Sequence, residues 1–234
     1  MNSRGSKIII GIDEVGRGPI AGPVCVAAFL VYEPVTFARE IKKITTGKNM
    51  DGQKLPLRDS KKLSRHNREA WVSIVSEWKK AGKCDFAISI THAEKIDQIG
   101  IAKAIRKSLA SSLEKVSRNI SLNTINSRSN KKNSVNESVQ VLLDGGLRAP
   151  VEYTNQKTII KGDEKEFAIA LASIVAKVHR DKHMMRLAKL YPKYGFESHV
   201  GYGTKDHYLA IKKHGITGIH RKSFLGKVLG AVAK

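Results

Sequence analysis

An apolar run followed at once by two carboxylates and a glycine-rich turn constrains this sequence more than any other stretch. Residues 8–12 read Ile-Ile-Ile-Gly-Ile, Asp13 and Glu14 follow, and Gly16-Arg17-Gly18 comes next. The run predicts a buried strand, and the glycines allow backbone angles that a side chain would block. Two carboxylates at the mouth of a core strand repel each other, so a divalent metal is their simplest partner. The alternative is an ordinary turn in which Asp13 caps backbone groups and Glu14 is solvated.

The charge balance favours a polyanionic partner. The 234 residues include 42 Lys and Arg against 21 Asp and Glu, a formal net charge of +21. Such a surface attracts polyanions and releases their counterions, which favours nucleic acid over a neutral metabolite. Charge alone leaves attachment to a ribosome or a membrane surface open. The longest nearly apolar stretch, residues 19–32, is too short to span a bilayer, so no membrane partner is expected.

The N-terminus and the cysteines predict a cytoplasmic protein. A few polar residues lead directly into the first strand, which fits neither a secretory signal nor a transit peptide. Cys25 and Cys84 both lie in apolar runs far apart in the sequence, so we expect buried, reduced thiols.

Strand-like and helix-like segments alternate along the chain, which predicts a central α/β sheet with its site at strand ends. Strands are expected at residues 7–12, 24–31, 85–90, 139–143 and 157–160, and helices at 37–44, 64–80, 101–116 and 164–190. Trp71 and Trp78 lie on one face of the second helix and are expected in the core. We expect a main domain over residues 1–190, with a flexible insertion at 117–138 that is rich in Asn and Ser, and a small C-terminal region over 191–234.

The fourth expected strand repeats the pattern of the first, because it ends in Asp144 followed by two glycines. If the two strands end at the same edge, Asp13, Glu14 and Asp144 converge. Mg²⁺ and Mn²⁺ prefer such oxygen ligands. Two ions about 4 Å apart activate water and stabilise the leaving oxygen in phosphodiester hydrolysis, which together with the basic surface suggests a nuclease.

Asp163 and Asp181 are both candidates for a fourth acid. On one straight helix they would lie about 27 Å apart, so both cannot bind one metal pair. Each has a structural alternative: Asp163 and Glu166 have the spacing of a capping box, and Lys177 and Asp181 that of an i,i+4 ion pair. Spacing alone leaves the choice open.

Six motifs follow one another along the chain. They are Gly-Ile-Asp-Glu-Val-Gly-Arg-Gly-Pro at 11–19, Asp-Ser-Lys-Lys-Leu-Ser at 59–64, Leu-Asp-Gly at 143–145, Lys-Gly-Asp at 161–163, Ala-Ser-Ile-Val-Ala-Lys-Val-His-Arg-Asp at 172–181 and Gly-Tyr-Gly-Thr at 201–204. In this order they resemble the motifs of the ribonuclease HII family, the type 2 ribonucleases H, from about residue 8 to residue 224.

The resemblance implies an α/β, ribonuclease H-like fold: a five-stranded mixed sheet flanked by helices, with a small helical C-terminal region for substrate binding. It implies Mg²⁺ or Mn²⁺ as cofactor and assigns its ligands to Asp13, Glu14, Asp144 and Asp163. Asp181 then belongs to a family motif without being a ligand. The resemblance also implies that the backbone of residues 16–18 (Gly16, Arg17, Gly18) reads the ribose 2′-hydroxyl, while Tyr202 packs on the sugar of the following nucleotide.

The remaining motif residues receive simpler interpretations. Plausible phosphate contacts are Lys61, Lys62, Lys177 and Arg180. Ser173 is expected to allow close packing of the long helix. Four histidines lack a spacing shared with the acids and are interpreted as surface or loop residues: His199, His207, His214 and His220.

The resemblance implies a metal-dependent endonuclease. Such an enzyme is expected to cut the RNA strand of RNA/DNA hybrids and to cut 5′ of ribonucleotides embedded in DNA, leaving a 3′-hydroxyl and a 5′-phosphate. We expect it to act as a monomer. The alternatives are a ribonuclease HIII-like or other ribonuclease H-like nuclease, or a non-catalytic hybrid-binding protein; the four acids argue against the last.

Overall fold

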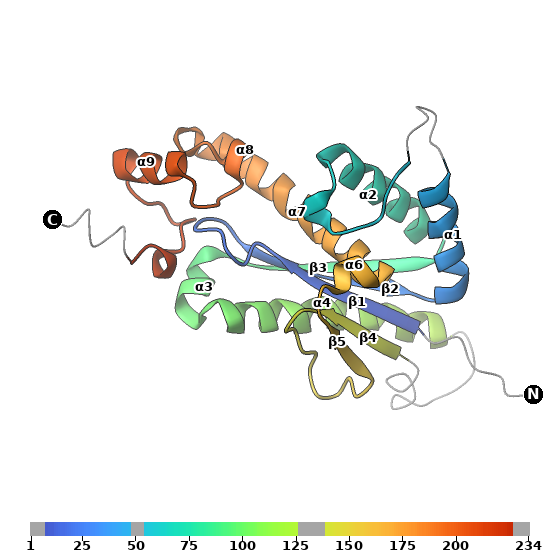
Figure 1. Ribbon diagram of the computed structural model, residues 1–234. Helices are drawn as coiled ribbons and strands as arrows, with labels where there is room; N and C mark the ends of the chain where they lie inside the picture. The colour runs from blue at the N-terminus through green and yellow to red at the C-terminus, as the bar shows by residue number, and fades with distance from the viewer. Residues whose placement is uncertain (1–7, 48–53, 126–138, 227–234) are drawn as a thin grey trace, which may run out of the picture.

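A five-stranded mixed sheet forms the centre of the protein (Figure 1). The structure is a computed structural model that describes residues 8–47, 54–125 and 139–226. The strand order is β3-β2-β1-β4-β5; β2 is antiparallel to β1 and β3, whereas β4 is parallel to β1 and β5. The strands are β1 Ile8–Val15, β2 Val24–Val31, β3 Cys84–Thr91, β4 Val139–Asp144 and β5 Gln156–Ile159.

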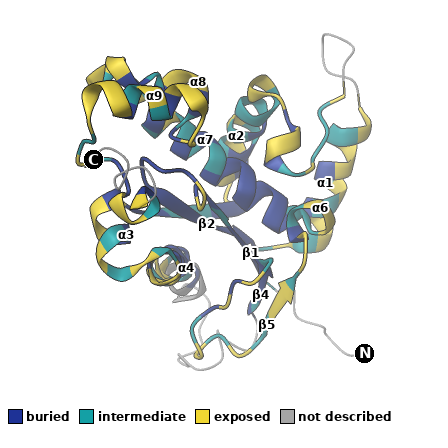
Figure 2. Cartoon of the chain, turned by 60° about the vertical axis from the view of Figure 1, so that its left-hand side comes forward, coloured by how far each residue is buried: buried dark blue, intermediate teal, exposed yellow. Residues whose placement is uncertain are grey.

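Helices cover both faces of the sheet. In Figures 1 and 2, α3 and α4 lie on one side, and α1, α2 and α7 lie on the other. The α-helices are α1 Pro34–Thr46, α2 Arg65–Lys80, α3 Ala93–Ile99, α4 Ile101–Ile125, α6 Gly162–Lys165, α7 Phe167–Leu190, α8 Phe196–His199 and α9 Lys205–His214. The described residues also form the 3₁₀ turns η1 Ser60–Lys62, η2 Pro192–Tyr194 and η3 Lys222–Phe224.

Each face of the sheet has its own hydrophobic core. One core packs β1, β2 and β4 against α4, and the other packs β2 against α1, α2 and α7. Every residue of β2 is buried, because helices cover it on both sides. Trp71 and Trp78 lie in the second core, as their helical spacing predicted, and the thiols of Cys25 and Cys84 are free and buried.

The helix expected at 101–116 is longer than predicted. Helix α4 continues to Ile125, so the expected flexible insertion at 117–138 begins inside a helix. The reason is the spacing of Leu109, Leu113, Val116 and Ile120, which are buried on one face and extend the apolar stripe. Residues 126–138 lie outside the described part of the chain.

The expected helix 164–190 is interrupted at Glu166, whose extended backbone (φ −124°, ψ 117°) separates α6 from α7. The capping box that the spacing of Asp163 and Glu166 allowed does not form, because Asp163 lies inside α6 and the N-cap is Lys161. Lys161 has a left-handed backbone (φ 54°), an uncommon conformation for a residue with a side chain.

The C-terminal segments do not form a separate core. A third hydrophobic cluster combines Phe196 and Ile211 with Ile20 and Met184, which lie before the expected boundary at residue 190. The division into residues 1–190 and 191–234 therefore stays a prediction. In the described part of the chain, no helix combines the length and apolarity needed to cross a membrane.

Gly11 allows α7 to lie directly against the central strand. A Cβ atom at this position would lie 2.2 Å from the backbone carbon of Ala168 and 2.5 Å from the backbone nitrogen of Ile169. Backbone atoms of a packed helix cannot move aside as a flexible side chain can. The contact fixes how closely α7 approaches β1.

We expect Gly11→Ala to destabilise the protein by about 3 kcal/mol, the upper end of the usual overpacking range. Urea unfolding followed by circular dichroism measures the change. Gly218→Ala is the matched control, since a Cβ there meets nothing within 4 Å. Equal stability of the two variants would mean that α7 does not depend on this close contact.

Candidate active site

The parallel pairing of β1 with β4 brings two acidic residues side by side. Ile12 pairs with Leu143, and Asp13 and Asp144 are the next residues of their strands. Asp144 is fixed further by the backbone N–H of Gly162, which donates a hydrogen bond to its carboxylate over 2.6 Å. Asp13 is buried, with 6% of its surface exposed. Sheet register thus produces the juxtaposition that the sequence predicted.

The electrostatics of these acids are unfavourable without a cation. Burial raises the pKa of Asp13 to about 8, and the charges of Glu14 and Asp144 add to the shift. Burial also raises the pKa of Glu14; Arg17 opposes this, whereas Asp144 reinforces it. Asp163 behaves likewise, because burial raises its pKa and the nearby Asp59 and Asp144 raise it further. The charge of Asp144 thus raises the pKa of each of the other three acids, so the four are close enough to repel one another.

Asp163 and Asp181 lie in different surroundings. Asp144 perturbs Asp163, whereas Asp181 forms an ion pair with Lys177 over 2.8 Å and lies 3.8 Å from Arg68. The ion pair between Lys177 and Asp181 is the i,i+4 contact that the spacing allowed. The choice of Asp163 over Asp181 as the fourth acid stays a prediction.

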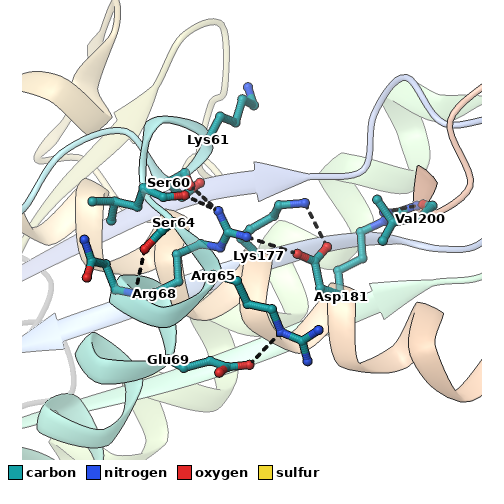
Figure 3. A network of polar contacts seen from close by, with 12 residues as sticks. Ser60, Lys61, Ser64, Arg65, Arg68, Glu69, Lys177, Asp181 and Val200 are labelled. Carbon is teal, nitrogen blue, oxygen red and sulfur yellow. Dashed lines mark hydrogen bonds and ion pairs between the residues drawn. The ribbon is translucent and has the colours of Figure 1, made fainter. Parts of the chain in front are cut away.

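A polar network that includes residues of α2 and α7 supports the motif at 59–64 (Figure 3). Arg68 donates hydrogen bonds to the carbonyls of Ser60 and Leu63, at 2.9 and 2.6 Å, and approaches Asp181. Lys177 is mostly buried and is paired with Asp181. Lys177 was expected to contact phosphate, but its ammonium group is instead occupied by the ion pair with Asp181.

Ser60 and Ser173 connect this network to the acids. Their hydroxyl groups lie 2.8 Å apart, and Ser173 also hydrogen-bonds Asp13 and lowers the pKa of its carboxyl group. Sequence reasoning gave Ser173 a packing role only, because one serine in a helix of alanines carries no signal for a contact with residue 60.

Lys61 and Lys62, the two lysines of the motif at 59–64, have different partners. Lys61 is exposed, and its charge lowers the pKa of both Glu14 and Asp163, so it lies near the acids. Lys62 forms an ion pair with Glu164. Lys61 is the lysine best placed for a phosphate.

Arg180 is not available to phosphate, which corrects the expectation from sequence. Its side chain is fully buried, and its guanidinium donates to the carbonyls of Pro23, Val200 and Ala21. Gly16 lies so close that a Cβ there, at φ +85°, would be 2.3 Å from Nε of Arg180. Arg180 therefore holds the glycine turn in place.

Tyr202 and the glycine turn come together at the surface. Tyr202 is 40% exposed, and its ring would lie 3.9 Å from a Cβ placed on Gly18. Two motifs separated by more than 180 residues thus line one surface.

Three of the four histidines expected at the surface are buried, and only His214 is exposed. His199 and His207 stack with ring centroids 4.4 Å apart, and His207 Nε2 lies 3.2 Å from His220 Nε2. Burial lowers the pKa of His207 and of His220 to about 4, so both rings are neutral and pack as aromatic groups. Hydrogen bonding of His207 Nδ1 to the Tyr202 carbonyl fixes the tyrosine backbone.

A basic pocket of about 190 Å³ adjoins the turn. Arg17, Arg106 and Arg148 line it together with apolar residues of α4 and of the loop after β4. All three arginines are exposed, which suits contact with a polyanion.

The chemistry of the donor set fits hard divalent cations, since it offers carboxylate oxygens and no thiolate or imidazole. Within the described ranges, no three Asp, Glu, His or Cys side chains already form a closed metal-ligand group. Glu14 lies 3.6 Å from Arg17, and Asp144 accepts the Gly162 N–H. The four acids as metal ligands therefore stay a proposal.

A mixed sheet in the order β3-β2-β1-β4-β5, flanked by helices on both faces, is a ribonuclease H-like fold. The family model described as Ribonuclease HII matches residues 10–227. The chain belongs to the ribonuclease HII family, and its enzyme class is ribonuclease H.

Curated relatives and solved structures agree with this family. The chain is 39% identical to ribonuclease HII of Fusobacterium nucleatum, covering 95% of this chain and 88% of that protein. It is 37% identical to ribonuclease HII of Clostridioides difficile, over 97% of this chain and 73% of that protein. The fold resembles RNase HII in a PCNA complex from Archaeoglobus fulgidus, with TM-score 0.61, 22% identity and coverage of 92% and 93%. It also resembles Bst-RNase HIII in complex with Mn²⁺, with TM-score 0.64, 17% identity and coverage of 98% and 71%.

The raised pKa of Asp13 predicts how stability depends on pH. The folded protein keeps a proton on Asp13, at a pKa of about 8, that the unfolded chain releases near the ordinary aspartate pKa of 3.8. Without metal, stability therefore falls as pH rises between these values, by at most about 4 kcal/mol from pH 5 to pH 8. Asp13→Asn should flatten this fall in urea unfolding with chelator present. An unchanged slope in the variant would contradict the assignment.

Proposed function

We propose that the protein cuts the RNA strand of RNA/DNA hybrids and cuts 5′ of ribonucleotides embedded in duplex DNA. The observation that carries the proposal is the pairing of β1 with β4, which sets Asp13 beside Asp144 at one edge of the sheet. Membership of the ribonuclease HII family supports it. The products would carry a 3′-hydroxyl and a 5′-phosphate.

Asp13, Glu14, Asp144 and Asp163 would hold Mg²⁺ or Mn²⁺. When bound, these ions supply the positive charge that activates water and stabilises the leaving oxygen. The chain itself places the acids: sheet register aligns two of them, Gly162 orients Asp144, and Ser173 hydrogen-bonds Asp13.

One surface would recognise the ribose of the substrate, and a separate basic surface would bind its phosphates. The backbone of Gly16, Arg17 and Gly18 would contact the 2′-hydroxyl, because glycines let main-chain groups approach a sugar edge. Tyr202 beside this turn would pack on the next sugar. Lys61 and the arginines of the basic pocket would contact phosphates, which carry no information on the sugar.

The C-terminal region would contribute to substrate binding through Tyr202. We also propose that the protein acts as a monomer in the cytoplasm, where its buried thiols remain reduced.

Cleavage of a DNA duplex with one embedded ribonucleotide tests the proposal. We expect cutting with Mg²⁺ or Mn²⁺ and none with chelator. Asp163→Asn should lose about a hundredfold or more in rate, since it withdraws charge from the cation site. Asp181→Asn is the control and should lose much less, because that residue pairs with Lys177 and Arg68. A larger loss in Asp181→Asn would exclude Asp163 as the fourth acid. Cutting of long hybrids alone would favour another ribonuclease H-like activity.

Tyr202→Ala should depress cutting at a single embedded ribonucleotide more than cutting within a long hybrid, whose many ribonucleotides offer other registers. Lys61→Gln should weaken both substrates alike and reduce the salt dependence. The measurement is the ratio of the two cleavage rates at fixed salt. If Tyr202→Ala leaves this ratio unchanged, Tyr202 does not recognise the sugar and serves only in packing.

A further inference from the structure

Arg221 holds the turn at residues 16–22 from inside the protein. Its side chain is fully buried and lies outside every motif that sequence reasoning used. The guanidinium donates to the carbonyls of Gly16 over 2.7 Å, of Arg17 over 3.0 Å and of Gly22 over 2.9 Å. The Arg221 backbone N–H donates to the carbonyl of Ile20 over 2.8 Å.

No carboxylate forms an ion pair with Arg221 in the described part of the chain. Burial lowers its pKa to about 9, and the neighbouring charge of Arg180 contributes to the shift. A buried cation is costly unless its donors are satisfied, and backbone carbonyls satisfy this one. A planar guanidinium can engage three carbonyls at once, which the compact ammonium group of lysine cannot reproduce in the same geometry.

Because Arg221 fixes these carbonyls, the geometry of the peptide bond also fixes the direction of the N–H groups that follow them. In a planar trans peptide, the carbonyl of one residue and the N–H of the next point in opposite directions. Arg221 draws the Gly16 and Arg17 carbonyls inward, so the N–H groups of Arg17 and Gly18 point away from the core. Both residues are exposed, and neither N–H donates a backbone hydrogen bond to any residue that the structure describes.

Two adjacent outward N–H donors suit an oxygen atom of a ligand. Tyr202 lies beside Gly18 on the same surface. The turn is attached by other contacts as well, since Arg180 binds the carbonyls of Ala21 and Pro23. Among the described residues, only the Arg221 side chain donates to the carbonyls of both Gly16 and Arg17.

We propose that Arg221 is a positioning residue for ribonucleotide recognition, which fixes the peptide units of Gly16 and Arg17 so that the N–H groups of Arg17 and Gly18 meet the 2′-hydroxyl. The inference rests on the proposed function. It predicts that Arg221 sets the preference for ribose over deoxyribose, whereas affinity for duplex DNA in general depends on exposed cations.

The test compares two duplexes that differ in one hydroxyl group. Affinity is measured for a duplex with one ribonucleotide and for the all-DNA duplex, with Ca²⁺ replacing the catalytic ion. Arg221→Lys should lower the ratio of the two affinities about fivefold, the value of one hydrogen bond, and Arg221→Gln at least as much. Affinity for the all-DNA duplex should change less than about twofold, since the phosphate contacts are untouched.

Tyr194→Phe is the matched control. Tyr194 is buried in the same C-terminal cluster, and its hydroxyl donates to the Gly215 carbonyl without touching the turn. It should leave the ratio unchanged. A ratio that stays at the wild-type value in both Arg221 variants overturns the inference. A wild-type protein with no preference for the ribonucleotide overturns the proposed function instead.

The amide NMR signals of Arg17 and Gly18 in the wild-type protein give a second test, which does not require the Arg221 variants to fold. On binding the ribonucleotide duplex, the amide signals of Arg17 and Gly18 should shift further than on binding the all-DNA duplex. Equal shifts with the two duplexes would overturn the inference.

Discussion

Repulsion among carboxylates at one edge of the sheet, of which Asp13 is buried and the others are partly buried, is the constraint on which the rest of the structure depends. Asp13 and Asp144 meet because β1 and β4 run parallel in a fixed register. A slip by one residue would turn the side chains to the opposite face, so the site requires both hydrophobic cores to hold that register. Gly11 contributes by letting α7 pack directly on β1, and α7 carries Ser173 to Asp13.

Positive charge is used in two different ways around this site. Arg68, Arg180 and Arg221 donate to backbone carbonyls and hold loops in place. Exposed cations such as Lys61 and Arg17 surround the acids and would meet phosphates. A guanidinium suits the first task because its donors lie in one plane and its charge persists when buried. The net charge of the chain therefore overstates the number of cations free for nucleic acid.

Local sequence patterns predicted the strands well, because an apolar or alternating run depends on only a few neighbouring residues. The five strands lie close to their expected positions, and Asp13 and Asp144 end up adjacent. Sequence patterns alone left Asp163 and Asp181 unresolved, since both alternatives were local. Their surroundings differ: the charge of Asp144 raises the pKa of Asp163, whereas Asp181 pairs with Lys177 and lies near Arg68.

The features that sequence missed depend on contacts between distant segments. Arg180 was expected to contact phosphate, and Arg221 drew no prediction, yet each binds a backbone carbonyl at least 157 residues away. His207 and His220 become buried because the third hydrophobic cluster surrounds them with aromatic rings such as Phe196. No periodicity within one segment carries such information.

Direct measurement of Mn²⁺ binding, by the electron paramagnetic resonance signal of the free ion, tests the central claim most directly. If the carboxylates form one cation site, wild-type protein binds Mn²⁺ without nucleic acid, and Asp144→Asn weakens binding about tenfold or more, a loss of about 1.4 kcal/mol. Asp181→Asn should bind as the wild type does. Equal Mn²⁺ affinity in the wild type and in Asp144→Asn would contradict the claim that these strand ends form a metal site.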